Sequence, residues 1–116
     1  MKYMLLMYVN ESDAPKTPEE YQAAAQDWAA YGQEASDAGV LLWSHGLEPV
    51  SNATTVRVRN GNTMTTDGPF AETHEQLGGL HLFECRDLDE AIRWAAKIPT
   101  AKYGSIEIRP LWAPKQ

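Results

Sequence analysis

Two carboxylates flank a stiff turn in the second half of the chain. Asp67 and Glu72 lie five positions apart, and Gly68 and Pro69 stand between them. Proline fixes φ and glycine permits backbone conformations that other residues avoid, so this turn could hold a carboxylate in place. A positioned aspartate whose pKa is raised by burial can act as a general base. The alternative is local, because aspartate often accepts hydrogen bonds from the backbone N–H groups of its own turn.

The chain has three histidines, and any of them could exchange protons near neutral pH. His81 lies in an apolar run, where it would either line the floor of a pocket or pack in the core with its ring nitrogens hydrogen-bonded. His74 follows the turn at Gly68-Pro69 and is expected in solvent. His45 is followed by a glycine and is expected in a loop, at the surface or at the mouth of a pocket.

These groups define one candidate site. The predicted catalytic residues are Asp67, as the base, and His81, as the histidine that reaches the same cleft. The predicted ligand-binding residues are Asp67, Phe70, Glu72 and His45. We predict no metal, because one cysteine and three dispersed histidines do not form a ligand pattern. We predict no bound cofactor, because the sequence contains neither glycine-rich phosphate-binding fingerprint.

Two helices are indicated by their first residues and by the spacing of their apolar residues. Thr17 is a typical N-cap, and a helix is expected over 18–38. Trp28 lies on its apolar face and should be mostly buried. A second capping pattern begins at Asp87, and the helix that follows it ends before Pro99.

Strands are expected between these helices. Residues 2–9 and 80–85 are apolar at both parities, which is typical of central strands that are covered on both faces. Asn60-Gly61 favours a tight hairpin turn, because both residues tolerate positive φ. The other strands are expected at 40–43, 54–59, 62–66 and 105–111.

This order of elements predicts an α+β fold: a ferredoxin-like βαββαβ domain, residues 1–116, with an inserted β-hairpin. Right-handed crossovers place both helices on one face of the sheet. The strands 2–9 and 80–85 then lie at its centre. The helix-free face needs a cover, and a second copy of the chain is the simplest one, so we predict a homodimer.

One long run carries a family resemblance. Residues 65–85 read TTDGPFAETHEQLGGLHLFEC, and this run resembles the DGPF-motif group of the YCII-related family, named for Asp67-Gly68-Pro69-Phe70. The segments MKYMLL at the start, TTVR at 54–57 and EIRP at 107–110 are also similar to that family. His74 departs from the motif, where lysine is expected.

The resemblance implies a ferredoxin-like sheet that pairs into a dimeric α/β barrel, and it implies little about activity. The group often occurs near, or fused to, extracytoplasmic-function sigma factors, which suggests a regulatory context. The wider superfamily includes small cofactor-free enzymes that act on aromatic or lactone-like compounds. A fold alone does not transfer such a function.

Composition restricts the partners and the compartment. The net charge is −6, and the ten Lys and Arg residues are scattered, so the chain lacks the basic surface that nucleic-acid binding requires. No apolar run approaches the roughly 20 residues of a membrane-spanning helix. Cys85 is the single cysteine and cannot form an internal disulfide, which favours the cytoplasm.

Three functions are compatible with these features. The first is a small-molecule enzyme without a cofactor that uses Asp67 as a carboxylate base. The second is a ligand-binding or regulatory dimer without turnover, associated with transcription under sigma-factor control. The third is a structural partner domain. A closed polar pocket that contains Asp67 and a histidine would favour the first two.

Overall fold

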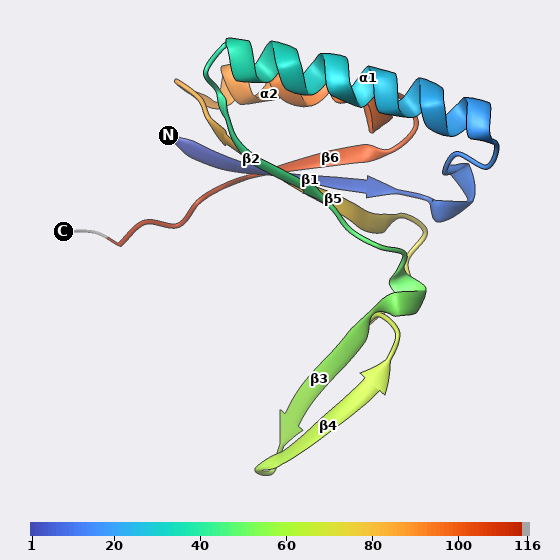
Figure 1. Ribbon diagram of the computed structural model, residues 1–116. Coiled ribbons are helices and arrows are strands. Elements are labelled where there is room, and N and C mark those ends of the chain that lie inside the picture. Colours follow the sequence, from blue (N-terminus) through green and yellow to red (C-terminus); the bar gives the residue numbers. More distant parts are fainter. Residues whose placement is uncertain (115–116) are drawn as a thin grey trace.

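The computed structural model describes residues 1–114 as an antiparallel sheet, two helices and a separate hairpin (Figure 1). In chain order the elements are β1 (Lys2–Val9), α1 (Pro18–Asp37), β2 (Leu41–Gly46), β3 (Thr54–Arg59), β4 (Asn62–Asp67), β5 (Gln76–Glu84), α2 (Leu88–Ala96) and β6 (Ser105–Pro110). A short 3₁₀ helix, η3 (Pro99–Lys102), joins α2 to β6. Within residues 1–114, no helix is both long and apolar enough to cross a membrane.

The main sheet has the strand order β2-β5-β1-β6, and all its neighbouring strands are antiparallel. Both helices lie on one face of this sheet (Figure 1). This is the predicted α+β, ferredoxin-like arrangement, and the two strands that are apolar on both faces, β1 and β5, are its centre.

The helix starts follow the capping chemistry that the sequence indicates. Thr17 Oγ1 accepts a hydrogen bond from the Glu20 backbone N–H at 3.1 Å, so α1 begins at Pro18. Asp87 Oδ1 accepts from the Glu90 backbone N–H at 2.9 Å, so α2 begins at Leu88.

The core lies between the helices and the sheet. Phe83 and Leu5 of the central strands are fully buried there, and Tyr31 of α1 covers them. Trp28 is partly buried and packs against this core. The buried apolar residues are Tyr3, Leu5, Tyr31, Ala35, Val40, Phe83, Cys85, Ala91, Ala95 and Ile98.

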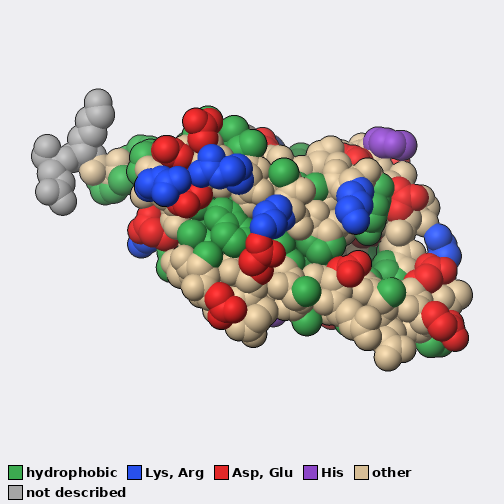
Figure 2. All heavy atoms as spheres, turned by 90° about the horizontal axis from the view of Figure 1, so that it is seen from above, with side chains coloured by type: hydrophobic (Ala, Val, Ile, Leu, Met, Phe, Trp, Pro, Cys, Tyr) green, Lys and Arg blue, Asp and Glu red, His purple; other side chains and the backbone are tan. Residues whose placement is uncertain are grey.

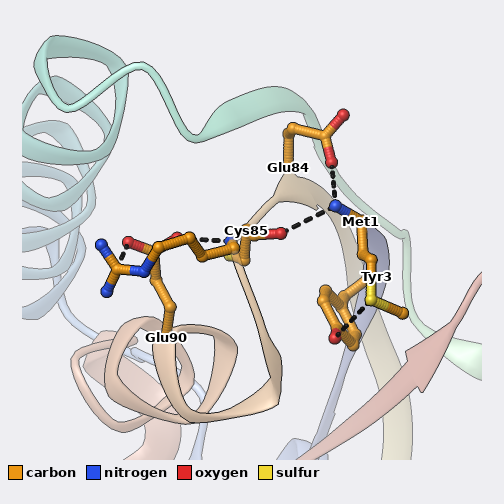
Figure 3. A network of polar contacts seen from close by, with 6 residues as sticks. Met1, Tyr3, Glu84, Cys85 and Glu90 are labelled. Carbon is orange, nitrogen blue, oxygen red and sulfur yellow. Dashed lines mark hydrogen bonds and ion pairs between the residues drawn. The ribbon is translucent and has the colours of Figure 1, made fainter.

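Cys85 is a structural residue at one end of the sheet (Figure 3). The Met1 amino group donates to the Cys85 carbonyl at 2.8 Å and pairs with the Glu84 carboxylate at 2.7 Å. Burial raises the pKa of the Cys85 thiol, and the nearby Glu90 carboxylate raises it further. The thiol is therefore protonated and a poor nucleophile at neutral pH.

Strands β3 and β4 form an arm (residues 54–67) that projects away from the main sheet as a separate two-stranded sheet (Figure 1). The predicted turn is confirmed, since Asn60 and Gly61 have φ of 52° and 78°. The arm leaves Val56, Val58 and Met64 exposed. The radius of gyration is 16.4 Å, whereas a compact domain of this length has about 13 Å.

Two strands are longer than predicted, and both errors have one cause. β5 begins at Gln76, not at residue 80, and β2 runs over Leu41–Gly46, not over 40–43. Gly79 forms ladder pairs with Met7 and Gly46, so its backbone is strand and not a flexible link. Antiparallel pairing across β5 overrides the local preference of glycine for turns.

Charges on the helix side of the molecule are mixed. On the face seen in Figure 2, two basic side chains lie next to each other and the others lie apart, among acidic and apolar ones. This face therefore offers no continuous basic surface of the kind that binds nucleic acid.

Candidate functional site

His81 lies at the centre of the sheet and faces α1. Its Cα is paired with Leu5 of β1 on one side and with Ser44 of β2 on the other. The side chain is 4% exposed, and its ring stacks on Trp28 with centroids 5.5 Å apart and planes at 17°. Neighbouring strands and one helix therefore fix the position and the plane of the imidazole.

The two ring nitrogens of His81 have different environments. Nδ1 is hydrogen-bonded to Ser44 Oγ at 2.6 Å. Nε2 is buried and has no hydrogen-bond partner within the part of the chain that the structure describes. A core histidine normally has both ring nitrogens hydrogen-bonded. The unpaired Nε2 is an exception, which makes it a candidate contact for a bound molecule.

Burial lowers the pKa of His81 below its ordinary value of 6.5. The imidazole is thus neutral at physiological pH, and one of its nitrogens then carries a lone pair. When Nδ1 holds the proton and donates it to Ser44 Oγ, that lone pair is on Nε2. This arrangement suits a general base.

A cavity of about 280 Å³ lies beside this ring, lined by Met7, Trp28, Ser44, Gly46, Gly79 and His81. The absence of a side chain at Gly79 helps to form it. A Cβ at that position would lie 3.6 Å from His81 Nε2 and 3.3 Å from Met7 Cε. Any larger residue at Gly79 would therefore fill the space next to the unpaired nitrogen.

A second cavity of about 300 Å³ adjoins the first, because Met7 and Trp28 line both. Its walls are mostly apolar, with Glu11 as the one charged residue among those described, and include Val9, Ala24, Pro15, Leu47, Pro49 and Tyr103. Thr100 of η3 also lines it and is 7% exposed. The space between α1 and the sheet therefore extends from His81 to η3.

The other predicted site residues do not line the cavity beside His81. Asp67 and Phe70 are exposed on and next to the arm. Glu72 lines a shallow hollow at the base of the arm. His45 is exposed on β2 next to Trp43, at 6.0 Å between ring centroids. Within one chain, the structure does not bring Asp67 and His81 into one cavity.

The turn after Asp67 is held by other groups. Gly68 has φ of 101°, and its N–H donates to the Ala53 carbonyl at 2.7 Å. Thr55 Oγ1 donates to the Gly68 carbonyl at 2.9 Å. Among the described residues, no hydrogen bond reaches the Asp67 carboxylate. The carboxylate is thus left for solvent or for another molecule.

Ser44, Gly79 and Met7 were not among the residues predicted for the site. Ser44 lies just beyond the strand expected at 40–43, and its contact with His81 depends on the β2–β5 register. If the strand is expected to begin at Gln76, the alternation of side chains along it places Gly79 on the same face as His81. Within residues 1–114, no three His, Cys, Asp or Glu side chains converge as a metal site would require.

The lowered pKa of His81 predicts a pH-dependent stability. Between the folded-state pKa and 6.5, the unfolded chain binds more protons at this residue than the folded chain. The contribution of His81 to the free energy of unfolding should therefore be fully present above pH 6.5 and should decrease as the pH falls below it. Urea unfolding at a series of pH values measures this slope.

The His81→Gln variant should lose that part of the slope, while the same substitution at the exposed His74 serves as the control. An unchanged slope in His81→Gln would contradict the prediction.

Comparisons with known proteins give one family match and one relative over nearly the whole chain. Residues 1–115 match the family model described as "YCII-related domain". An uncharacterised protein of Rhizobium meliloti (strain 1021) is 40% identical over 114 residues, which cover 96% of this chain and 92% of that protein.

Proposed function

Since the chain belongs to the family of YCII-related domains, we propose that it binds a small, mostly apolar molecule between α1 and the sheet, and that His81 moves a proton on that molecule without a cofactor. The observation that carries this proposal is the unpaired, buried Nε2 of His81 beside a cavity. Within the family, we assign the chain to the group named for Asp67-Gly68-Pro69-Phe70.

The different environments of the two His81 ring nitrogens indicate the chemistry. Nε2 accepts a proton from an acidic C–H or O–H group of the bound molecule, while Nδ1–H donates to Ser44 Oγ. The resulting imidazolium returns its proton to a second position of the same molecule, so the net reaction is an isomerisation. The Trp28 ring, stacked on His81, covers one face of the imidazole and can stabilise the transient cation.

The residues that line the two cavities indicate the class of substrate. Met7 and Trp28 offer a flexible thioether and a flat aromatic surface, and both favour an apolar body. Neither of the two adjoining cavities is lined by Lys or Arg of the described residues. The site therefore suits an uncharged compound, such as a ketone or a lactone, in preference to a phosphate ester.

Deuterium exchange into 2-tetralone tests the proposal, because this apolar ketone has acidic α-protons and fits the proposed class. In D₂O the wild-type protein should accelerate exchange at the α-carbon. The His81→Gln variant should lose about 10²–10⁴-fold of that acceleration, the usual contribution of a positioned general base.

The Asp67→Asn variant separates the two candidate bases. If it keeps full exchange activity while His81→Gln loses it, His81 is the base. The reverse result would identify Asp67 as the base, as the sequence suggests. Binding of 2-tetralone without any exchange would favour the alternative, a ligand-binding or regulatory protein without turnover.

A homodimer is part of the proposal. Leu80 and Leu82 alternate with the buried His81 and Phe83, so they point to the face that no helix covers. Met4 and Leu6 of β1, paired with Leu82 and Leu80, extend this apolar face. A second copy is its expected occupant, and the extended arm would gain contacts in the same assembly.

A further inference from the structure

Thr100 has the second unpartnered polar side chain in the region between α1 and the sheet. Its Oγ1 is buried and has no hydrogen-bond partner among the described residues, and the residue is 7% exposed. Across the described chain, Thr100 Oγ1 and His81 Nε2 are the two buried side-chain polar atoms without a partner. The two residues each line one of the two adjoining cavities.

Two such atoms at adjoining cavities indicate a ligand, because a buried polar atom without a partner costs free energy in the unliganded protein. Met7 and Trp28 separate the two atoms as the shared walls of both cavities. The Met7 side chain is unbranched and lies 3.1 Å from a Cβ placed at Gly78, so it packs where two glycines leave space. Such a side chain can move aside for a molecule that spans both cavities.

We infer that the ligand of this protein is an elongated, uncharged molecule with a polar group near each end, one paired with His81 Nε2 and the other with Thr100 Oγ1. Its apolar middle lies along Met7 and Trp28. A hydroxyl or carbonyl group satisfies Thr100 Oγ1, which can both donate and accept. This inference rests on the proposed function of the His81 cavity and adds the second anchor and the shape of the ligand.

Linear alcohols provide a test that does not require the natural ligand. The probes are α,ω-diols of five to ten carbons and the 1-alkanols of the same lengths, titrated by NMR against protein labelled at histidine and tryptophan nitrogens. A second hydroxyl weakens binding in an apolar cavity unless it finds a partner. We therefore expect at least one diol to bind as tightly as its 1-alkanol or more tightly.

The Thr100→Val variant isolates the second anchor, since valine has nearly the same shape and lacks the hydroxyl. It should weaken that diol roughly two- to tenfold, the effect of one neutral hydrogen bond, and leave the 1-alkanol unchanged. Its melting temperature should stay equal or rise, because Oγ1 has no internal partner to lose. Thr65→Val on the exposed arm is the matched control and should change neither affinity.

Two outcomes would overturn the inference. Diols that always bind more weakly than 1-alkanols, with no effect of Thr100→Val, would remove the second anchor but keep the His81 cavity. A large loss of melting temperature in Thr100→Val would show that the hydroxyl already has a partner. If neither class of probe shifts the His81 or Trp28 signals, the proposed site itself fails.

Discussion

Replacing Phe83 by alanine should lower the free energy of unfolding by about 3–5 kcal/mol, as for other large-to-small substitutions of fully buried aromatic residues. Phe83 is 0% exposed and lies near the C-terminal end of β5. Its ring lies 6.4 Å from that of Tyr31 and 6.1 Å from that of Trp94, so the substitution leaves a cavity bordered by both helices. Urea unfolding at one fixed protein concentration measures the loss.

The chain contains its own control for this substitution. Phe70 is the other phenylalanine, and it is 78% exposed. Phe70→Ala should change the free energy of unfolding by less than about 0.5 kcal/mol, as is usual for surface positions. Similar losses of unfolding free energy in the two variants would mean that Phe83 of β5 is not part of the core.

Replacing Leu82 by lysine should separate the proposed homodimer into monomers. Leu82 lies on the helix-free face of β5, where the second copy is expected. A lysine ammonium buried at such an interface has no partner, and the desolvation penalty is several kcal/mol. Dimer affinity should fall at least about a hundredfold. Light scattering at micromolar concentration should change from twice 12.9 kDa to 12.9 kDa.

Ile92→Lys on the exposed face of α2 is the matched control and should leave the mass unchanged, because Ile92 is already 47% exposed in the single chain. A wild-type protein that scatters as a monomer at micromolar concentration would refute the dimer. A stable interface of this kind should bury more than roughly 1,200 Å² in total.

The fold was predictable because its signals are local and agree with one another. Thr17 and Asp87 have the side chains that cap the two helices, and Asn60-Gly61 has the backbone freedom that the arm requires. The apolar character of β1 and β5 on both faces identifies the two central strands. The strand ends were less predictable, because Gly79 is held in β5 by pairing with residues distant in the sequence.

The site was only partly predictable, because it depends on register. His81 stood out as a histidine in an apolar run, but its partner Ser44 becomes visible only when β2 is paired with β5. Thr100 lies in η3, and its role depends on the tertiary position of a hydroxyl that no motif marks. Asp67, prominent in the sequence, is exposed next to the arm, and its role in chemistry stays a prediction.

The arm also determines where local unfolding occurs in the chain. A two-stranded hairpin with neither face covered is at best marginally stable in water. The arm should therefore separate from the rest of the chain as an independent opening unit, with amide protons that exchange far faster than those of β1 and β5. If the second copy covers it, that exchange slows as the protein concentration rises, and the local order of the arm reports assembly.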